Sequence, residues 1–550
     1  MLEGFVPWPA DLAAAYKRDG VWEGITVAGM VERTAHAAPD KIAVVHGTTR
    51  IRYAELITQA RQLAGALLEA GIGPQDRVVM QLSNTPTFIR LYLALNYIGA
   101  IPVMALRAHR HAEVRHFINA SGAIAYAIPD RIGEFDYRAM ADEMRAAFPA
   151  LRAILVDGEA SAGQIAFASL AGCRQEEGAL AGRLAAVRPD PADVSTMLLS
   201  GGTTSMSKLI PRTHDDYVLN ARLCARAGGF SPATVLGVIL PLGHNYNLAS
   251  PGLLGAFHVG GTVVLMRGTD TDEIFSTVVR ERVSVIAAAV PLIANWLNAD
   301  IGARYDLSTL EVVQNGGARL PPELRARMRE RFGCTPQEIY GTAEGLINMT
   351  RLDDPDDVLL HSSGAPVSEL DEIRVVDDDG RDVADGEAGE LVTRGPYTIR
   401  GYYNAAEKNA EAFLPGGWYR MGDIVRKRGR YVYTEGRRKD QINRGGEKIS
   451  CDEIENLIFA HPAVKSVVLV AMPDPVFGEK ACACVILKPG AALGFDELVG
   501  FLRAQRIASF KLPERLEIMS EFPVSPVGKI LKRQVREMVA EKVAQGSAER

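Results

Sequence analysis

The sequence predicts an α/β protein: parallel sheets covered by helices along most of the chain, then a small antiparallel unit, then a separate C-terminal domain. Three observations support this prediction. Apolar, strand-like runs alternate with helix-like stretches, short strands with turn residues replace them between about 371 and 433, and a new unit starts after Gly436. A chain of 550 residues is also too long for one compact core.

The parallel part is predicted from two series of strands. In the first series, a strand over residues 76–82 is followed by a helix over 85–98, a strand over 101–105 and a helix over 112–120. The second series has strands over residues 234–240, 261–266, 283–289 and 311–314. Because strands buried on both faces are apolar along their whole length, these runs indicate parallel sheets with helices on both sides.

The C-terminal part has a different pattern. Residues 371–433 carry short strands separated by turn residues, which predict an antiparallel unit or small barrel. After a polar stretch we expect helices over 451–460 and 495–505, strands over 464–471 and 481–487, and a basic helix over 529–542. We therefore expect a large domain of residues 1–438 and a small domain of residues 439–550, of ordinary domain size.

Composition narrows the class of protein. Hydrophobic residues make up 47% and charged residues 23%, which excludes a disordered or fibrous chain. The 61 basic and 67 acidic residues leave a net charge of −6, so the chain has no excess of positive charge that would bind nucleic acid or an anionic membrane. The N-terminus lacks the pattern of a secretory signal, and the longest apolar stretch is too short to cross a bilayer. We expect a cytoplasmic protein.

The six cysteines suit that expectation. They are scattered along the chain, and only Cys482 and Cys484 are close together, where a strand places both on one face. We expect buried thiols in a reducing compartment.

The segment most informative about chemistry is 196–212. An apolar strand-like run ends in the small and hydroxyl residues Ser200, Gly201, Gly202, Thr203 and Thr204. Lys208 follows them. Small residues let the backbone approach a polyanion, and clustered hydroxyls and amides can hold phosphate oxygens. The segment is not a Walker A loop, because Ser207 rather than glycine precedes the lysine. Taken alone, it is equally well an ordinary turn.

Three further segments favour a phosphate-binding loop over an ordinary turn. Residues Tyr340–Gly345 follow a probable strand and place Glu344 at its end, where a carboxylate can hold Mg²⁺. Asp423 stands in a tight turn suited to hydrogen bonding ribose hydroxyls, and Lys529 follows Gly528 in a presented loop. Each segment is weak evidence by itself.

Together, in this order, these segments resemble the ANL superfamily of adenylate-forming enzymes over essentially the whole chain. The narrower resemblance is to stand-alone aryl-acid adenylating enzymes of siderophore synthesis, such as 2,3-dihydroxybenzoate–AMP ligases and salicylate–AMP ligases. It is carried by residues 244–246, 343–355, 394–403 and 439–450. The resemblance implies two parallel αβα subdomains and a small β-barrel in the large domain, with a mobile α+β C-terminal domain.

The resemblance also implies roles for individual residues. The expected ATP and AMP contacts are Ser200, Gly201, Gly202, Thr203, Thr204, Lys208, Gly316, Gly317, Ala318, Arg319, Tyr340, Gly341, Thr342, Asp423, Arg437 and Lys529. The expected catalytic residues are Lys529, Glu344, His244 and Thr204, with Glu344 and Thr204 also on Mg²⁺. The expected aryl-acid contacts are Asn245, Tyr246, Ser250, Asn315, Gly316 and Ile339, and Lys439 matches the hinge between the domains.

The sequence departs from the family pattern at several positions. Ser205 and Ser207 stand where the phosphate loop usually has glycine and proline, which changes the loop's stiffness. Asn315 replaces an apolar residue and can add polarity to the acid pocket, and Arg319 replaces a lysine or proline. The run of His109, Arg110 and His111 lacks cysteine or carboxylate partners, so we interpret it as structural.

The predicted reaction joins an aryl acid to AMP, releases pyrophosphate and passes the aryl group to a phosphopantetheine thiol. The resemblance implies that Asn245, an uncharged amide where amino-acid-activating relatives have an aspartate, disfavours amino acids, and that Ser250 favours 2,3-dihydroxybenzoate over salicylate. Ile339 is less decisive, and Asn315 leaves amino- or aza-substituted acids open. No attachment segment follows Lys529, so we expect the aryl carrier protein to be a separate chain.

Two alternatives remain at this point. One is an aryl-CoA ligase that uses free CoA. The other is a non-catalytic protein that binds acyl-AMP, which the retained Glu344, Asp423, Lys439 and Lys529 argue against.

Overall fold

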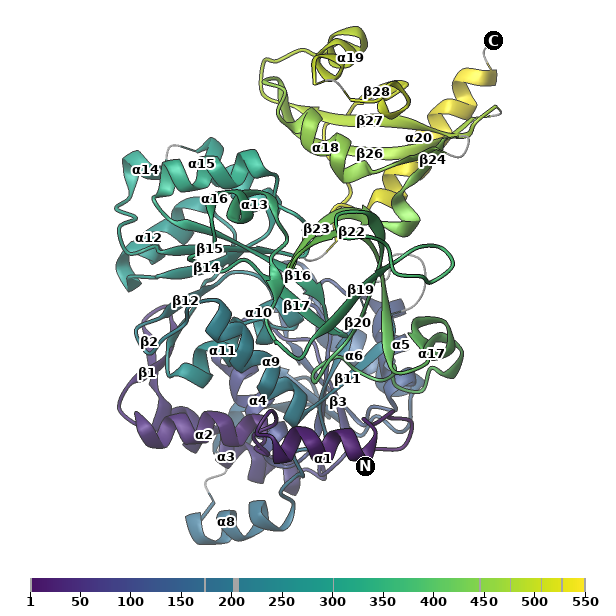
Figure 1. The fold of residues 1–550 in the computed structure, drawn as a ribbon. Helices are drawn as coiled ribbons and strands as arrows, with labels where there is room; N and C mark the ends of the chain where they lie inside the picture. Colours follow the sequence, from purple (N-terminus) through teal and green to yellow (C-terminus); the bar gives the residue numbers. More distant parts are fainter. Residues whose placement is uncertain are drawn as a thin grey trace.

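The computed structural model describes residues 2–172, 175–200, 207–299, 301–444, 447–474, 476–505, 507–525 and 528–548, without the side chains of Lys439, Lys448 and residues 545–548. A large part with three large sheets and the two-stranded sheet of β6 (Arg131–Ile132) and β7 (Phe135–Asp136) carries a smaller part at one end (Figure 1). This confirms the predicted α/β fold class. Within the described residues, no helix is both long enough and apolar enough to cross a bilayer.

The first sheet has the strand order β11-β10-β4-β3-β5-β8-β9. Its strands are β3 (Arg77–Met80), β4 (Ile101–Met104), β5 (Ala125–Pro129), β8 (Ala153–Asp157), β9 (Ile165–Ala166), β10 (Val194–Leu199) and β11 (Leu209–Thr213). All neighbours run parallel except the β10–β11 pair, which is antiparallel. The phosphate-loop segment therefore connects two antiparallel strands, unlike the strand-to-helix connection of a Walker A loop.

The second sheet has the strand order β18-β17-β16-β15-β14-β12-β13-β1-β2. Its strands are β1 (Ile42–His46), β2 (Thr49–Arg52), β12 (Val235–Val238), β13 (Thr262–Leu265), β14 (Val285–Ala288), β15 (Val312–Gly316), β16 (Thr335–Thr342), β17 (Gly345–Met349) and β18 (Ala365–Pro366). The central strands are parallel, and antiparallel strands close both edges. β14 is buried along its length, as a strand covered on both faces must be.

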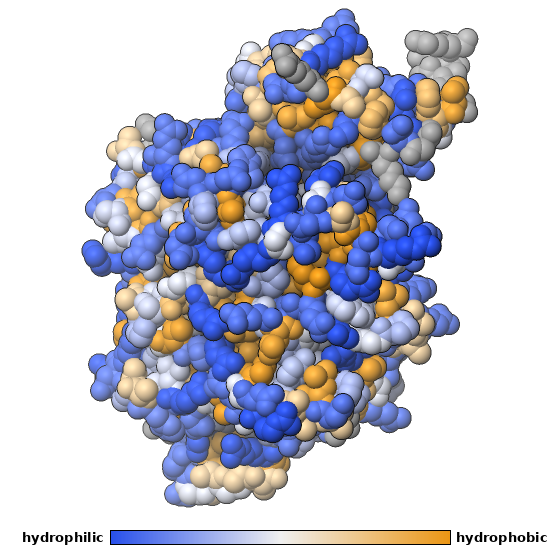
Figure 2. Space-filling model, in the orientation of Figure 1, coloured by the Kyte–Doolittle hydropathy of each residue, from blue (hydrophilic) through white to orange (hydrophobic). Residues whose placement is uncertain are grey.

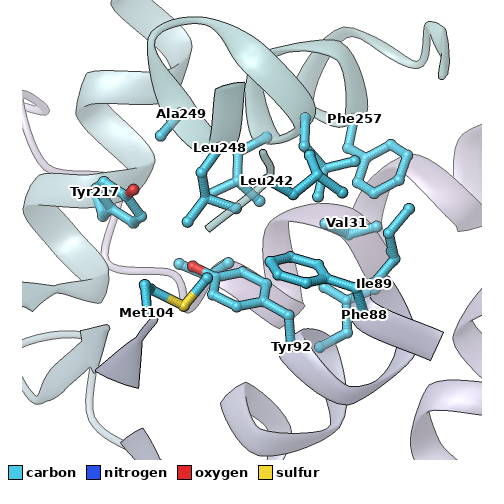
Figure 3. Close-up of a cluster of buried hydrophobic side chains, with 14 of the residues drawn as sticks. Val31, Phe88, Ile89, Tyr92, Met104, Tyr217, Leu242, Leu248, Ala249 and Phe257 are labelled. Carbon is cyan, nitrogen blue, oxygen red and sulfur yellow. The ribbon is translucent and has the colours of Figure 1, made fainter. Parts of the chain in front are cut away.

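Helices cover both sheets, and several of them fill the layer between the sheets. The helices of this part include α1 (Ala10–Arg18), α2 (Val27–Ala37), α3 (Tyr53–Glu69), α4 (Pro86–Tyr97), α5 (His111–Ser121), α9 (His214–Ala227), α10 (Asn245–Ala249), α11 (Gly252–Val259), α13 (Val290–Asn298) and α15 (Pro322–Phe332). Figure 3 shows Phe88, Ile89 and Tyr92 of α4 facing Leu248 and Phe257 across the core. This packing fixes α9 and α10, which carry part of the candidate site.

The third sheet is antiparallel and forms the barrel-like unit between the large sheets and the C-terminal part. Its strands are β19 (Glu372–Val376), β20 (Ala388–Arg394), β21 (Phe413–Leu414), β22 (Trp418–Arg428) and β23 (Tyr431–Arg437). Leu391, Val425 and Val432 are fully buried and pack in one hydrophobic cluster on its inner face. β22 and β23 pair so that Asp423 lies opposite Arg437.

The C-terminal part has its own sheet and cores. Its elements are η1 (Arg438–Asp440), β24 (Ile442–Arg444), β25 (Glu447–Ile449), α18 (Cys451–Phe459), β26 (Val464–Asp474), β27 (Gly478–Leu487), α19 (Phe495–Ala504), β28 (Arg515–Ile518) and α20 (Lys532–Ala548). Cys482 and Cys484 lie on one face of β27 and pack with Val535 and Val539 of α20. The five described cysteines are free and buried, and Cys173 lies outside the described residues.

Two predicted boundaries are wrong. The basic helix starts at Lys532, not Lys529, because Val524 pairs with Ile530 in a β-bridge and Gly528 has a φ of +78°. Tyr340 to Thr342 belong to β16 instead of following it, because β17 turns back and pairs with them. The visible surface is mostly hydrophilic, with scattered apolar areas (Figure 2).

Candidate active site

The site is built where strands from two different sheets end near each other. Gly316 closes β15, and the parallel register places it beside Ile339 of β16. Tyr340 follows on β16, and its hydroxyl donates to Asp423 Oδ2 of β22 at 2.7 Å. One hydrogen bond therefore joins the second parallel sheet to the barrel at this point.

Asp423 is the centre of a small polar cluster. Arg437 Nε lies 2.6 Å from Asp423 Oδ1, and the residue is only 5% exposed. Burial raises the pKa of the Asp423 carboxyl, while Arg437 and the Tyr340 hydroxyl oppose that shift. Burial also holds the pKa of Tyr340 well above its usual value, so the phenol keeps its proton. A carboxylate fixed from both sides in this way is a rigid acceptor for a pair of ligand hydroxyls.

Glu344 lies between β16 and β17, and tyrosines of the barrel side hold it. The Tyr402 hydroxyl donates to Glu344 Oε1 at 2.9 Å, and the backbone N–H of Ile399 donates to the Glu344 carbonyl at 2.8 Å. The ammonium of Lys208 lies 4.3 Å from the centre of the Tyr402 ring. A carboxylate and a lysine from opposite sides of the large part therefore meet at one tyrosine.

A buried arginine braces the same loop. Arg212 of β11 is fully buried and its Nε lies 2.6 Å from Asp216 Oδ1. Its Nη1 donates to the Ala343 carbonyl at 3.0 Å and its Nη2 to the Tyr397 carbonyl at 3.2 Å. Arg212 thus ties the phosphate-loop hairpin to the Glu344 loop.

The phosphate loop itself is described only at its two ends. Ser200 Oγ accepts from the Lys208 N–H at 2.9 Å, and the Ser200 N–H donates to the Lys208 carbonyl at 3.0 Å. The predicted contacts Gly201, Gly202, Thr203 and Thr204, with Ser205, lie outside the described residues. In the portion that is described, no three His, Cys, Asp or Glu side chains converge as a metal cluster. Glu344 is a single carboxylate, which suits Mg²⁺ that keeps water and phosphate ligands.

Lys529 of the C-terminal part is brought to this cluster. The Ser525 N–H donates to the Lys529 carbonyl at 2.7 Å, and a Cβ on Gly528 would lie 3.5 Å from Ala289 of the large part. Crowding by protein atoms, and next the positive charge of Arg437, lower the pKa of Lys529 to about 8, while Asp423 acts in the opposite direction. Water still reaches this exposed residue, which favours its ammonium, so Lys529 is positively charged at neutral pH.

His244 and Asn245 stand at the start of α10. His244 Nδ1 accepts from the Tyr246 N–H at 3.3 Å, and burial together with the nearby Lys529 charge lowers the pKa of His244 to about 4. Asn245 Oδ1 accepts from the Tyr217 hydroxyl at 2.8 Å, and its Nδ2 donates to Ser250 Oγ at 3.2 Å. The histidine is therefore neutral, and the asparagine is oriented by two partners.

Tyr246 forms a wall of this region against β15. A Cβ at Gly316 would come within 2.9 Å of the Tyr246 ring, so only glycine allows this approach. Tyr246 and Ile339 belong to one buried cluster with Cys224. The Tyr246 hydroxyl is buried and finds no partner among the described residues.

Asn315 is tied to a buried ion pair. Its Nδ2 donates to the Ala318 carbonyl at 2.8 Å and to Glu338 Oε2 at 2.9 Å, and Arg325 Nη2 lies 2.9 Å from the same oxygen. These contacts shape the turn in which Gly317 has a φ of +83°. Arg319 Nη2 donates to the His361 carbonyl at 2.8 Å, away from this pair.

The hinge candidate lies in η1, directly after β23. The side chain of Lys439 is outside the described residues. On either side of it, Arg438 Nη1 lies 2.6 Å from Glu390 Oε2, and Asp440 Oδ1 lies 3.6 Å from Arg536 Nη2 of α20. In the run of His109, Arg110 and His111, His109 Nδ1 accepts from the Leu106 N–H at 3.0 Å. The expectation that the run has no carboxylate partner is wrong, because His111 Nε2 lies 3.3 Å from Glu143 Oε2.

Several residues of this region escape reasoning from sequence. They are Tyr217, Asn220, Arg212, Glu338, Asn348 and Tyr402. All but Tyr402, which lies in a loop, are common residues in an ordinary helix or strand, and only the tertiary fold brings them to the site. Both polar atoms of Asn348 are buried without a partner among the described residues, a state that usually marks a bound water or ligand.

Comparison with known proteins follows the same division of the chain. A family model described as "AMP-binding enzyme" matches residues 31–403, and one described as "AMP-binding enzyme C-terminal domain" matches residues 453–529. The chain is 44% identical over 547 residues to the 2,3-dihydroxybenzoate-AMP ligase of Bacillus subtilis, covering 99% of both chains. It is 42% identical to the salicyl-AMP ligase / salicyl-S-ArCP synthetase of Mycobacterium tuberculosis, covering 97% of this chain and 94% of that one. The apo structure of Mycobacterium smegmatis MbtA matches with a TM-score of 0.75 and 38% identity, covering 97% and 98% of the two chains.

Proposed function

This chain belongs to the AMP-binding enzymes, and from that membership we propose that it is an aryl-acid–AMP ligase. It uses ATP to convert an aryl acid to aryl-AMP with release of pyrophosphate, and then transfers the aryl group to a thiol. Relatives that match along nearly their whole length are named for 2,3-dihydroxybenzoate and for salicylate, which supports an aryl acid as substrate.

The observation that carries the proposal is the position of Lys529. Its charge acts on Asp423, Arg437 and His244, so one cation from the small domain stands among groups of the nucleotide and acid regions. When a carboxylate attacks the α-phosphorus of ATP, two anions approach and negative charge grows on the phosphoryl oxygens. A positioned ammonium stabilises that charge, and little proton transfer is required.

We propose the remaining nucleotide contacts from the residues around Asp423 and from the phosphate-loop segment. Asp423, held by Tyr340 and Arg437, accepts from the ribose hydroxyls. Gly316, Gly317 and Ala318 line the adenine on one side, with Tyr340 on the other. Lys208 and the loop from Ser200 to Thr204 bind the β- and γ-phosphates.

Mg²⁺ fits this donor set as a partner of the nucleotide. Glu344 supplies one buried carboxylate, and Thr204 supplies a hydroxyl. Bound there, the ion adds positive charge to the phosphates. Tyr402 orients the Glu344 carboxylate for this role, since its hydroxyl already occupies one oxygen.

The acid is proposed to lie between α10 and the ends of β15 and β16. Asn245 has one free N–H and one free lone pair after its contacts with Tyr217 and Ser250, enough to pair a 2-hydroxyl. Tyr246, Gly316 and Ile339 form the walls, and Asn315 stands behind them. We propose 2,3-dihydroxybenzoate as the preferred acid, with salicylate as the alternative.

The proposed acceptor is the phosphopantetheine thiol of a separate aryl carrier protein. The name of the Mycobacterium tuberculosis relative includes transfer to such a carrier, which supports this choice. Lys439 is proposed as the hinge about which the small domain turns between the two half-reactions.

One experiment tests both parts. Acid-dependent exchange of labelled pyrophosphate into ATP measures the first half-reaction. The second is measured by supplying, separately, CoA or a carrier protein whose phosphopantetheine thiol is free. We expect exchange with an aryl acid and transfer to the carrier. Exchange without any acid dependence would contradict the ligase, and faster transfer to CoA would assign the acceptor to CoA instead.

A further inference from the structure

The hydroxyl of Ser250, directly after α10, is enclosed by polar side chains from two helices. Asn245 Nδ2 donates to Ser250 Oγ at 3.2 Å, and Asn220 Nδ2 of α9 donates to it at 3.4 Å. A hydroxyl oxygen has two lone pairs, so these amides occupy its acceptor capacity. What remains is the Ser250 O–H, which can only donate.

The contacts of both amides with neighbouring groups turn their nitrogens toward Ser250. Asn220 Nδ2 also donates to the Ala249 carbonyl at 2.7 Å, and Asn245 Oδ1 accepts from the Tyr217 hydroxyl at 2.8 Å. A flip of Asn220 would place its oxygen against the Ala249 carbonyl oxygen, so the direction of its bond to Ser250 is fixed by the fold. In this structure the Tyr217 hydroxyl donates to Asn245 Oδ1, which turns Asn245 Nδ2 toward Ser250.

Cys224 follows Asn220 by one turn on α9, so its thiol lies on the helix face from which Asn220 contacts the Ser250 hydroxyl. Burial, more than any other cause, holds the pKa of Cys224 well above its usual value, so it is an uncharged thiol. The sulfur of a neutral thiol is a weak acceptor. The Ser250 O–H is consequently held only weakly, and a better acceptor can take it over at little cost.

Cys224 stands in the region proposed for the acid. It shares a buried cluster with Tyr246 and Ile339. The Tyr246 hydroxyl and Asn220 Oδ1 are buried and have no partner among the described residues. Buried polar atoms without partners indicate that a polar ligand or water completes the region.

We propose that Cys224 is a specificity-determining residue: as a weak acceptor beside Ser250, it leaves the Ser250 O–H available to a ring substituent that accepts a hydrogen bond. The inference rests on the proposed function, because it takes Asn245 and Ser250 to contact the acid. The substrate class is a 2-hydroxy aryl acid with an acceptor at the adjacent ring carbon, such as a 3-hydroxyl. A 3-amino group, whose nitrogen lone pair is delocalised into the ring, is a poor acceptor and is disfavoured.

Two conservative variants of Cys224 test the proposal through the ratio of kcat/KM for 2,3-dihydroxybenzoate to that for salicylate. Cys224→Ser introduces a strong acceptor that retains the Ser250 O–H, so the ratio should fall by about five- to tenfold. Cys224→Ala removes the competitor, so the ratio should stay the same or rise. Salicylate has no 3-substituent, and its own kcat/KM should change little in either variant. Equal shifts in both variants, or a ratio unchanged by Cys224→Ser, would overturn the proposal.

A second measurement needs no variant. With the unmodified protein, 3-amino-2-hydroxybenzoate should be used at least about tenfold less efficiently than 2,3-dihydroxybenzoate. Comparable efficiency would overturn the donor role of Ser250 and the proposal for Cys224. Failure of every acid to drive pyrophosphate exchange would instead overturn the proposed function, so the two failures are distinguishable.

Discussion

Lys529 of the small domain and Asp423 of the barrel lie close enough for each to influence the charge of the other. Tyr340 and Arg437 hold the Asp423 carboxylate from the side of the large domain. The small domain therefore contributes a cation to a site whose other parts belong to the large domain. Under the proposed function, adenylation therefore depends on the placement of both domains.

Replacing Lys529 by alanine should abolish most acid-dependent pyrophosphate exchange. The ammonium is needed when carboxylate and α-phosphate meet, and loss of such a contact with developing charge costs about 10²–10³-fold in rate. Thiol transfer from pre-formed aryl-AMP should be largely spared, because the acyl phosphate is already activated. The two half-reactions are measured separately, and equal losses in both would contradict the role assigned to Lys529.

The pH dependence of adenylation should report the same residue. Crowding and Arg437 lower the pKa of Lys529 to about 8, and the protonated form is the active one. The kcat/KM for exchange should therefore be constant below this pKa and fall as pH rises through about 8. In Lys529→Arg the guanidinium stays charged, so the alkaline fall should move to higher pH. If the alkaline fall of kcat/KM stays at the same pH in this variant, the fall belongs to a group other than Lys529.

Phe459 of α18 should favour the domain arrangement seen here. It packs both in the small-domain core and against the large-domain cluster that contains Leu324 of α15. Phe459→Ala should lower exchange about five- to tenfold, as expected for a half-buried phenylalanine worth about 1–1.5 kcal/mol. Thiol transfer should be unchanged or faster, since the contact belongs to one arrangement only.

Lys439→Pro should affect the two half-reactions in the opposite way to Phe459→Ala. Proline fixes φ and removes an N–H at the hinge candidate, so transfer should suffer while exchange stays near normal. Normal transfer in Lys439→Pro, or equal loss of both half-reactions in Phe459→Ala, would argue against a turning small domain.

Arg325→Met should destabilise the large domain. Arg325 and Glu338 are 1% and 3% exposed, and removing one partner of such a pair costs about 3–5 kcal/mol. Burial already raises the pKa of Glu338, and without Arg325 the pKa rises further. A carboxyl whose folded pKa exceeds its unfolded pKa contributes stability only at low pH, so the loss should grow as pH rises above about 4.5. Denaturant unfolding across pH checks this. The double variant with Glu338→Gln should recover part of the loss.

The predictable parts of the fold are those encoded locally. The apolar run of β14 and the amphipathic pattern of α18 each lie within a few residues, so periodicity was enough to place them. The start of α20 was not predictable, because the bridge between Val524 and Ile530 overrides the helical pattern from Lys529.

The residues of the site likewise divide into those that the sequence could predict and those that it could not. Motif residues such as Asp423 and Lys529 could be named from short segments that resemble a family. The groups that orient them could not, because Arg212 reaches Ala343 and Tyr397 across the fold, and Tyr217 reaches Asn245 from another helix. No local pattern specifies such contacts, which arise from tertiary packing.

The most direct test of the account is a comparison of acids in pyrophosphate exchange by the unmodified protein. The acids are 2,3-dihydroxybenzoate, salicylate and benzoate, and the quantity is kcat/KM. Leaving the polar groups around Asn245 without a 2-hydroxyl should cost about 1–3 kcal/mol. The account therefore predicts that both hydroxy acids exceed benzoate by at least about fivefold, with 2,3-dihydroxybenzoate first. Benzoate equal to either hydroxy acid, or no exchange with any of the three, would contradict it.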